Sequence, residues 1–293
     1  MQLRGSWVAI VTPMKATGSL DFDAFEKLLH WHCEEGTDGI VVLGTTGEAA
    51  TLSVNERAEV IKFAIKAVNH RVPVIVGTGT NNTRQSIDYS LQAERFGTDG
   101  CLLVTPYYNK PTQQGLIAHF KAIASELAVP VLLYNGPDRT ACDILPETVA
   151  ALAPVHNIIG IKEATGDLKR LTALQAVCPE DFIFLSGDDS TACDFILAGG
   201  HGTISVTANI VPARMHAMCE AALAGRTKQA KAIDHDLREL HQNLFVQSNP
   251  IPAKWALLEM GMIESGIRLP LLMLEASYHG KVRQTLKQMG LVA

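Results

Sequence analysis

Short, almost continuously apolar runs recur at fairly even intervals along the chain, each bounded by glycine, proline or a polar residue. A strand that is buried on both faces, as in a parallel sheet, has this pattern. The runs predict eight strands, at residues 7–11, 39–43, 74–77, 101–104, 131–134, 158–162, 183–185 and 203–206.

The segments between these runs carry apolar residues at helical spacing. Asp21 is the predicted N-cap of a first helix over residues 22–32. Ser53-x-x-Glu56 has the form of a capping box and predicts a helix over residues 56–68. Further helices are predicted at residues 84–96, 113–127, 146–152, 168–177, 190–197 and 212–223.

Eight strands, each followed by a helix, predict an α/β fold of the (β/α)₈ barrel type, also called a TIM barrel. A doubly wound sheet is the alternative, but such a sheet usually has about five or six strands. Residues 225–293 show only helical patterns, with a break at Asn249-Pro250-Ile251-Pro252. We therefore expect a barrel over residues 1–224 that carries the active site, and an all-helical C-terminal region over residues 225–293 that contributes to oligomer contacts.

Composition narrows the class of protein. The 293 residues are 47% hydrophobic and 19% charged, with a formal charge of −5, as expected of a packed globular protein. No run of lysine and arginine could follow a nucleic-acid backbone, and no stretch is apolar enough to predict a membrane span or a signal peptide. The six cysteines form no C-x-x-C pair. We expect a cytoplasmic protein that binds neither nucleic acid nor membrane.

In a (β/α)₈ barrel, functional residues lie at the C-terminal ends of the strands. The predicted ends carry Gly44-Thr45-Thr46-Gly47-Glu48, Gly77-Thr78-Gly79, Thr105-Pro106-Tyr107-Tyr108-Asn109, Tyr134-Asn135, Lys162-Glu163-Ala164, Ser186-Gly187-Asp188 and Ser205. Hydroxyl groups and one lysine should therefore converge on one face of the barrel.

Lys162 is the strongest single signal, because it ends the apolar run Ile158-Ile159-Gly160-Ile161. If Ile159 and Ile161 pack beneath the helices, Lys162 projects into the barrel and the space above Gly160 is left free. Burial favours the neutral amine of a lysine, which can attack a carbonyl carbon. The alternative is a lysine that is solvated or paired with a carboxylate such as Asp188, but the apolar run and the barrel position favour the reactive amine.

Two further residues could serve this chemistry. Tyr134 ends the preceding strand, and its hydroxyl could move protons in a chain with that of Thr45. The periodicity alone is also consistent with a core tyrosine. Arg139 could hold a carboxylate bidentately, or it could be a surface arginine paired with Asp138 or Asp143.

Three other motifs do not predict a site. His30-Trp31-His32-Cys33 lies within a helix, where residues two apart do not share a face. Gly77-Thr78-Gly79 lacks the third glycine of a dinucleotide fingerprint, and no phosphate-binding P-loop motif is present in the sequence. Asp188-Asp189 could hold a divalent ion, but an N-cap before residues 190–197 explains one of the two carboxylates.

Four motifs in the same order and spacing resemble those of the dihydrodipicolinate synthase family, over nearly the whole chain. They are Gly44-Thr45-Thr46-Gly47-Glu48, Pro106-Tyr107-Tyr108-Asn109, Tyr134-Asn135-x-Pro137-x-Arg139-Thr140 and Gly160-Ile161-Lys162-Glu163. The resemblance implies a (β/α)₈ lyase that binds pyruvate as a Schiff base and condenses it with L-aspartate-4-semialdehyde, in the pathway to lysine and diaminopimelate. It implies no metal and no organic cofactor.

The resemblance also implies residue roles. Lys162 would form the imine, and Thr45, Tyr134 and Tyr108 would relay protons, with Tyr108 reaching the site of a neighbouring subunit. The substrate-binding residues would be Thr46 for the pyruvate carboxylate, Arg139 for the semialdehyde carboxylate, and Gly187 and Ile204 through backbone groups. The family is usually a homotetramer, a dimer of dimers.

Two departures from the family pattern bear on these expectations. Gly136 and Asp138 stand where many relatives have a larger apolar residue and a serine, so the loop that holds Arg139 is differently braced. In lysine-regulated relatives a histidine and a glutamate at the tight-dimer interface help to hold free lysine. The positions that remain from such an inhibitor site are Ala49, Asn81, Gln85 and Tyr107, with Arg57 or Val54 at the histidine position. We therefore expect weak or absent feedback by lysine.

Two other functions are consistent with much of this pattern. N-acetylneuraminate lyase and keto-sugar-acid aldolases share the chemistry of Lys162 and Tyr134, but Thr45-Thr46 with Arg139 favours a short acidic aldehyde. A non-catalytic barrel that binds a small molecule is the alternative from another class, because fold alone does not determine function. The presence of Lys162, Tyr134, Thr45 and Tyr108 together favours the enzyme.

Overall fold

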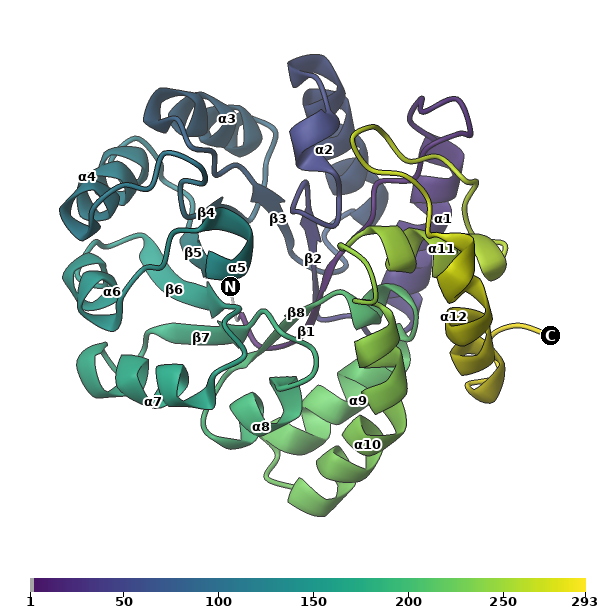
Figure 1. Cartoon of the computed structure of the whole chain (residues 1–293). Helices are drawn as coiled ribbons and strands as arrows, with labels where there is room; N and C mark the ends of the chain where they lie inside the picture. The colour runs from purple at the N-terminus through teal and green to yellow at the C-terminus, as the bar shows by residue number, and fades with distance from the viewer. Residues whose placement is uncertain (1–2) are drawn as a thin grey trace.

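Eight parallel strands close into a barrel at the centre of the computed structural model, which describes residues 3–293 (Figure 1). Neighbouring strands pair in chain order, and β1 also pairs with β8. The strands are β1 (Gly5–Ala9), β2 (Gly39–Val42), β3 (Val74–Gly77), β4 (Gly100–Val104), β5 (Val131–Asn135), β6 (Ile158–Glu163), β7 (Ile183–Ser186) and β8 (Gly202–Ser205). The predicted (β/α)₈ barrel is confirmed.

Helices connect consecutive strands and surround the barrel (Figure 1). They are α1 (Phe22–Glu34), α2 (Val54–Val68), α3 (Thr83–Arg95), α4 (Gln113–Ala124), α5 (Pro137–Thr140), α6 (Pro146–Leu152), α7 (Leu168–Val177), α8 (Ala192–Leu197) and α9 (Pro212–Leu223), with short 3₁₀ turns η1 (Ala49–Thr51) and η2 (Thr207–Asn209). The one-turn helix α5 and both 3₁₀ turns were not predicted. Ser53 and Glu56 form the predicted capping box, and α2 begins directly after Ser53.

The C-terminal region is helical, as predicted, with α10 (Thr227–Asn243), α11 (Ile251–Glu259) and α12 (Ala276–Gln288). Helix α10 packs against α9, and α12 packs against α10 and α11. None of the helices within residues 3–293 combines the length and the apolar character needed to cross a bilayer.

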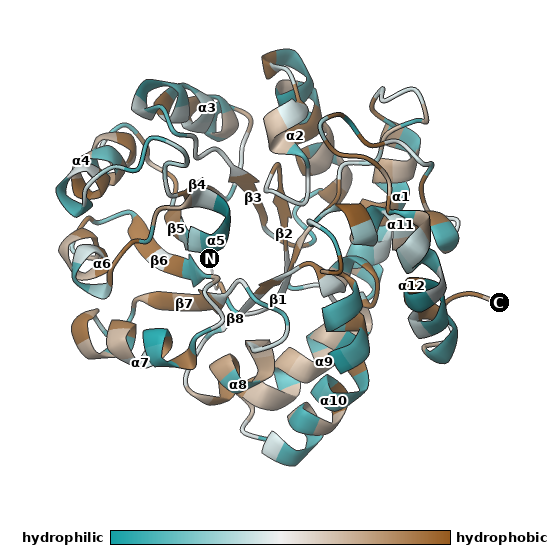
Figure 2. Cartoon of the chain, viewed as in Figure 1, coloured by the Kyte–Doolittle hydropathy of each residue, from teal (hydrophilic) through white to brown (hydrophobic). Residues whose placement is uncertain are grey.

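The apolar side chains form two layers. One fills the barrel and includes Trp7, Val41, Leu132 and Leu185, while the larger one lies between the strands and the surrounding helices. Because inward and outward side chains alternate along each strand and both faces are covered, the strands are apolar along most of their length. Figure 2 shows the strands largely in brown and the outer turns of α10 and α12 largely in teal.

Strand β6 differs from the expectation at two residues. The register with β5 shifts between Val131 and Leu132, and Ile159 packs against the interior cluster instead of beneath the helices. The prediction of free space above Gly160 was also wrong, because a Cβ atom at Gly160 would lie 2.4 Å from the carbonyl oxygen of Ile183. Glycine is therefore required by the close approach of β7. Lys162 nevertheless faces the interior, as predicted, because the alternation resumes after the irregularity.

Two smaller predictions concern the start of α8 and the side chain of His32 in α1. Helix α8 begins two residues later than predicted, and Asp188 Oδ2 accepts a hydrogen bond from the Thr191 backbone N–H at 3.0 Å, in the turn before this helix. His32 lies within α1, where its Nδ1 is 2.9 Å from Thr37 Oγ1. Burial lowers the pKa of His32 to about 3, so it is a neutral core histidine.

Candidate active site

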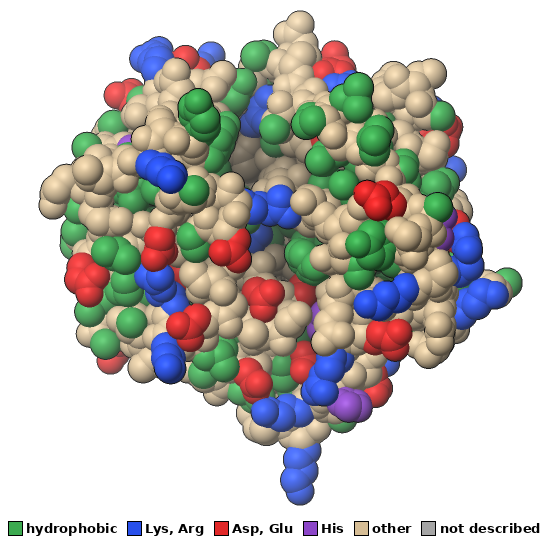
Figure 3. All heavy atoms as spheres, in the orientation of Figure 1, with side chains coloured by type: hydrophobic (Ala, Val, Ile, Leu, Met, Phe, Trp, Pro, Cys, Tyr) green, Lys and Arg blue, Asp and Glu red, His purple; other side chains and the backbone are tan. Residues whose placement is uncertain are grey.

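A cavity of about 460 Å³ opens at the C-terminal ends of the strands, where the fold predicts the functional residues. Figure 3 shows this hollow near the centre of the face, with lysine or arginine side chains inside it. The cavity is lined by Ala9, Val41, Gly44, Thr45, Thr46, Leu102, Tyr134, Gly136, Asp138, Arg139, Lys162, Ala164, Gly187, Asp188, Val206, Phe245, Ser248 and Asn249.

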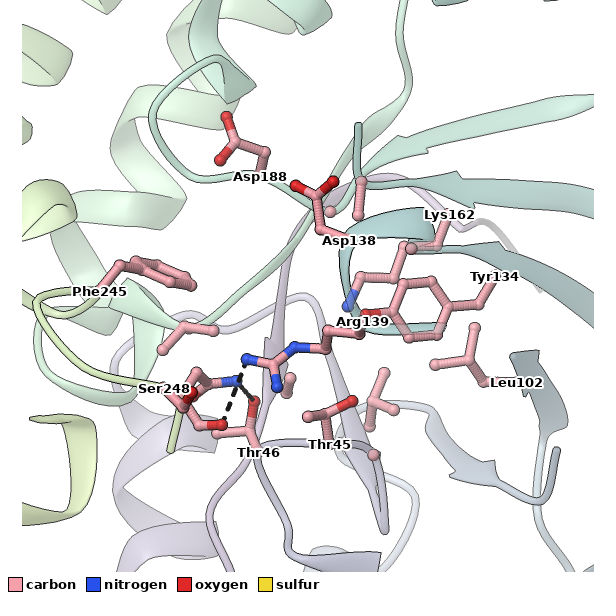
Figure 4. A pocket seen from close by; sticks show the side chains of 18 residues that line it. Thr45, Thr46, Leu102, Tyr134, Asp138, Arg139, Lys162, Asp188, Phe245 and Ser248 are labelled. Carbon is pink, nitrogen blue, oxygen red and sulfur yellow. Dashed lines mark hydrogen bonds between the residues drawn. The ribbon is translucent and has the colours of Figure 1, made fainter. Parts of the chain in front are cut away.

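Lys162 is the penultimate residue of β6 and is 7% exposed. It pairs in register with Tyr134 on β5, and its Nζ lies 4.4 Å from the centroid of the Tyr134 ring. Figure 4 shows the Lys162 amine and the Tyr134 hydroxyl directed into the same part of the cavity, toward Thr45. The amine and two hydroxyl groups that the sequence predicted to meet are therefore brought together.

The alternative in which Lys162 pairs with Asp188 is not observed. The salt bridges within residues 3–293 do not include Lys162. Asp188 Oδ2 instead accepts hydrogen bonds from the Thr191 backbone N–H, at 3.0 Å, and from Thr191 Oγ1, at 2.7 Å. The Lys162 amine is therefore not engaged by a carboxylate of the described residues and can approach a substrate carbonyl in the cavity.

Glycine at position 187 makes room for the lysine. A Cβ atom there would lie 2.8 Å from Lys162 Cε and 2.5 Å from the Cβ of Ala164. The turn after β7 therefore passes so close to β6 that any side chain would displace Lys162 or Ala164.

The Thr45–Thr46 turn follows β2 and forms the opposite wall of the cavity. It is closed by hydrogen bonds from the Gly47 N–H to Gly44 O, at 3.2 Å, and from the Glu48 N–H to Thr45 O, at 3.1 Å. The Thr45 side chain is exposed to the cavity, whereas that of Thr46 is buried and its Oγ1 is hydrogen-bonded to Asn249 Nδ2 at 2.9 Å. Within residues 3–293 the backbone N–H groups of Thr45 and Thr46 donate to no other group, so they are available to an anion.

Arg139 supplies the positive charge at the cavity mouth. It lies on α5, and its Nη2 donates to the Asn249 carbonyl oxygen at 3.3 Å. Figure 4 shows its guanidinium extending toward Thr46 and Ser248. The proposed surface pair with Asp143 is not seen, because Asp143 Oδ2 lies 2.6 Å from Arg170 Nη2.

Gly136, one of the two departures from the family pattern, lies against the catalytic tyrosine candidate. A Cβ atom at Gly136 would lie 3.2 Å from the Tyr134 hydroxyl. A larger residue here would press on the ring, so glycine leaves Tyr134 less tightly braced from this side. Asp138, the other departure, is exposed and lines the cavity.

A polar network at the ends of β5 and β6 was not predicted. Glu163 is 3% exposed and accepts hydrogen bonds from Asn135 Nδ2, at 3.0 Å, and from the Thr165 N–H, at 2.8 Å. Asn135 Nδ2 also donates to Asp143 Oδ1, at 2.8 Å. Burial raises the pKa of Glu163. This network connects the ends of β5 and β6 to the loop that follows α5.

The structure places two predicted residues outside the cavity of this chain. Tyr108 is 88% exposed, has a left-handed backbone with φ of 74°, and does not line the cavity. Ile204 is 1% exposed and packs in the interior cluster, while Val206 lines the cavity at the end of β8. Thr45, Thr46, Tyr134, Arg139, Lys162 and Gly187 are brought together.

Sequence reasoning missed the contribution of the C-terminal region. Phe245, Ser248 and Asn249 line the cavity although they lie beyond the last strand. The sequence indicates this segment only as a break in the helical pattern at Asn249-Pro250, and nothing in the local pattern relates that break to the cavity.

The expected remnant of an inhibitor site lies away from the cavity, around α2 and α3. The guanidinium of Arg57 lies within this region. Its Nη2 donates to Gly77 O at 2.8 Å and its Nη1 donates to Ala49 O at 3.2 Å. It also lies 4.3 Å from the Tyr89 ring centroid. Burial lowers the pKa of Arg57. Gln85 Nε2 donates to the Tyr89 hydroxyl at 3.2 Å.

The remaining positions of this remnant include Asn81, Tyr107 and Val54. Asn81 O accepts a hydrogen bond from Asn109 Nδ2 at 2.8 Å, and Tyr107 is 40% exposed. Val54 is also exposed, at 51%.

The fold and this site together define a lyase of the class I aldolase type. The particular family follows from comparison with known proteins. The model of the Dihydrodipicolinate synthetase family matches residues 2–289, and the chain belongs to this family.

Three relatives illustrate the match. A protein of Alcanivorax borkumensis named 4-hydroxy-tetrahydrodipicolinate synthase is 55% identical over 290 residues, which cover 99% of each chain. The chloride-inhibited dihydrodipicolinate synthase from Acinetobacter baumannii, solved in complex with pyruvate, has a TM-score of 0.98 and 50% identity, covering 99% of this chain and 100% of that one. The enzyme from Cyanidioschyzon merolae, solved with lysine bound, has a TM-score of 0.95 and 37% identity and covers 99% of each chain.

Proposed function

We propose that this chain condenses pyruvate with L-aspartate-4-semialdehyde, and that Lys162 holds pyruvate as an imine during the reaction. One observation carries the proposal: a lysine amine lies at the bottom of the cavity, beside the Tyr134 ring, and has no carboxylate partner among residues 3–293. The pyruvate found with the Acinetobacter baumannii relative supports the first substrate. The name shared by full-length relatives supports the product, 4-hydroxy-tetrahydrodipicolinate.

The reaction begins when the neutral amine of Lys162 attacks the keto carbon of pyruvate. A carbon–nitrogen bond forms, the keto oxygen takes up protons and leaves as water, and an imine remains. The hydroxyl of Tyr134, acting in a chain with that of Thr45, delivers these protons and receives those of the amine. The cavity wall beside the amine includes Ala9, Val41 and Leu102, which keeps the amine out of bulk water.

The second half of the reaction forms a carbon–carbon bond. Loss of a proton from the methyl group gives an enamine, whose terminal carbon attacks the aldehyde of the second substrate. The amino group of that substrate then attacks the imine carbon, which closes the ring and releases Lys162. The semialdehyde carboxylate binds Arg139, because a guanidinium at the cavity mouth can hold a carboxylate through two hydrogen bonds.

The carboxylate of pyruvate binds at the Thr45–Thr46 turn. Its two backbone N–H groups make no hydrogen bond within the described chain and can form a small anion-binding concavity. Gly187 allows Lys162 to reach this position, and Gly187 and Val206 line the pocket on the side of β7 and β8.

The active assembly is a homotetramer, a dimer of dimers, in which Tyr108 of the partner subunit completes each proton relay. The 88% exposure of Tyr108 supports this role, since a tyrosine that projects from its own chain is free to enter a neighbouring site. We expect the chain to act in the cytoplasm, as part of lysine and diaminopimelate biosynthesis, without a metal or an organic cofactor.

The proposal is tested by borohydride reduction in the presence of pyruvate, followed by peptide mass mapping. We expect a reduced pyruvate adduct on Lys162, and condensing activity with L-aspartate-4-semialdehyde but no cleavage of sialic acid. Lys162→Ala should lose both the adduct and at least about 10³-fold in kcat, because no other group supplies the nucleophile. Lys169→Ala, which removes an exposed lysine at the start of α7, is the matched control and should retain both. An adduct on another residue, or a Lys162→Ala enzyme with normal turnover, would contradict the proposal.

A further inference from the structure

The Thr45–Thr46 turn is attached to the C-terminal region by a fully buried ion pair. Glu48 follows the turn, and its Oε1 contacts Nζ of Lys254 on α11, 206 residues further along the chain. The Lys254 side chain is 0% exposed and that of Glu48 is 1% exposed. Neither residue lines the cavity, so neither can touch a substrate from this position.

Further hydrogen bonds connect the pair to the segments that follow β1 and α11. Glu48 has a left-handed backbone with φ of 53°, and its Oε2 accepts a hydrogen bond from the Arg268 N–H at 3.1 Å. Lys254 Nζ also donates to Thr12 O at 3.1 Å. Thr12 Oγ1 in turn donates to Gly47 O at 2.7 Å, so the end of β1, the turn and α11 are joined in one network.

The same part of the C-terminal region contacts the turn a second time. Asn249, just before α11, is hydrogen-bonded to Thr46 through its side chain and to Arg139 through its carbonyl oxygen. Figure 1 shows the chain after α11 running past α1 and α2. The contacts made by Asn249 and Lys254, which are close together in the chain, therefore constrain both the position and the tilt of the Thr45–Thr46 segment relative to α11.

A buried ion pair is a poor source of stability. The cost of removing two charges from water can exceed their attraction, and well-packed apolar residues in their place are often neutral or stabilising. Such a pair does, however, specify geometry, because each charge must remain within reach of the other. Burial lowers the pKa of Lys254, while the contact with Glu48 opposes that shift and favours the ammonium.

We infer that Glu48 and Lys254 are positioning residues for the reaction, which hold the Thr45–Thr46 turn against Lys162. The turn carries one proton-relay hydroxyl and the N–H groups proposed to bind pyruvate. If the contact between Glu48 and Lys254 is lost, the Thr45–Thr46 turn moves relative to the Lys162 amine. Imine formation then becomes slower and pyruvate binding weaker. The kinetic part of this inference rests on the proposed function, whereas the structural role of the Glu48–Lys254 pair in holding the turn does not.

The test uses neutral replacements, singly and together. Glu48→Gln and Lys254→Met each leave one buried charge without its partner and should lower the Tm clearly. The double variant removes both charges and should recover most of that Tm. The matched control is Glu259→Gln, which removes the ion pair between Glu259 and Arg283 on α11 and α12, away from the turn.

The kinetics of the double variant decide between a positioning role and a merely structural one. With Tm recovered, kcat should still be lower by about 10- to 100-fold and the KM for pyruvate higher, since small misplacements of catalytic groups have effects of this size. The KM for the semialdehyde should change little, because Arg139 lies on α5. Backbone amides of residues 44–52 should exchange with deuterium faster than in the wild type. The Glu259→Gln control should match the wild type in all these measurements.

A double variant with recovered Tm, wild-type kcat and wild-type pyruvate KM would overturn the inference, as would unchanged exchange of residues 44–52. If the double variant does not fold, Thr12→Val serves instead, because it removes only the hydroxyl bond to Gly47 and keeps the shape of the side chain. Thr12→Val should change kcat, the pyruvate KM and the exchange of residues 44–52 in the same directions, but by less. Wild-type values of all three would again reject the positioning role. Failure of the proposed function is recognised separately, because the wild type would then form no pyruvate adduct while the exchange difference persisted.

Discussion

Gly187 shows how one backbone position determines the reach of a neighbouring side chain, that of Lys162. The turn after β7 passes within van der Waals distance of Lys162 and Ala164, and only a residue without a Cβ atom fits there. The space that this glycine leaves is occupied by the lysine stem, so the amine is held in one direction. A residue without a side chain thereby governs the direction of the Lys162 amine.

Gly187→Ala should therefore lower activity by about 10- to 100-fold, because its Cβ atom would press on Lys162 Cε and shift the amine. The measurements are kcat and the rate of borohydride trapping with pyruvate. Gly280→Ala is the control: it lies within α12 with no atom in the way of a Cβ, and should be neutral or stabilise the protein by about 0.5–1 kcal/mol. Equal activity of the two variants would show that the lysine tolerates the displacement.

The response to free lysine is also decided by single residues. Arg57 and Gln85 provide no carboxylate to pair with the ammonium groups of an inhibitor, and Arg57 is already engaged with backbone carbonyls and Tyr89. Micromolar lysine should leave turnover unchanged. Gln85→Glu should introduce measurable inhibition at higher concentrations. Inhibition of the wild type at micromolar lysine would contradict this expectation.

At the scale of elements, helix α2 illustrates how a local signal and a distant partner converge. Ser53 and Glu56 form a capping box at its start, as their spacing predicted. The Glu56 carboxylate also accepts a hydrogen bond from Arg268 Nη1 at 2.9 Å. The start of α2 is thus stabilised both by its own sequence and by the loop that follows α11.

This arrangement predicts a pH dependence of stability. The hydrogen bond from Arg268 lowers the pKa of Glu56 from 4.5 to about 2. The folded protein therefore keeps Glu56 charged where the unfolded chain takes up a proton, so its stabilising contribution is fully present above pH 4.5 and is lost as the pH falls toward 2. Because both side chains are partly exposed, we expect a contribution of about 1 kcal/mol.

The measurement is urea unfolding at about pH 6 and about pH 3.5, the range over which this linkage acts. The wild type should lose about 1 kcal/mol more between these conditions than Glu56→Gln. Asp88→Asn, which breaks an exposed pair with Arg84, should behave as the wild type. Equal losses in the wild type and Glu56→Gln would reject the role of this contact.

The strands could be predicted from the sequence because burial on both faces makes each one nearly continuously apolar. Their ends were less predictable where distant groups terminate them: β1 stops at Ala9, and the Val11 N–H donates to Asn209 Oδ1 instead of a neighbouring strand. The irregularity at Ile159 and the one-turn helix α5 leave no periodic signal, because both are too short for one.

The candidate site, like the strands, was predictable only in part. Lys162, Tyr134 and Thr45 were found because the fold places strand ends together. Asn249 and Lys254 were not, since their positions result from packing of the C-terminal helices on the barrel, and nothing in their local sequence indicates the turn that they contact.

At the scale of the whole molecule, the exposed Tyr108 predicts that active sites are shared between subunits. Lys162→Ala and Tyr108→Phe should each be nearly inactive alone. In a mixed dimer, however, the Tyr108→Phe subunit still has its lysine and receives an intact Tyr108 from its partner. Co-expression in equal amounts should restore about a quarter of wild-type activity, since half of the dimers are mixed and each has one complete site.

The check is kcat per total chain in the co-expressed sample, compared with the two variants purified separately and then assayed in one tube without subunit exchange. Analytical ultracentrifugation should show tetramers in every sample. Recovery of activity without exchange, or none after co-expression, would contradict sharing of the site.

The dependence of the cavity on Phe245, Ser248 and Asn249 has a consequence for synthesis on the ribosome. All eight strands have been translated by residue 205, yet the wall supplied by the segment after α10 does not exist until some forty residues later. A nascent barrel can close before it can hold its substrates, so catalytic competence is acquired late in translation.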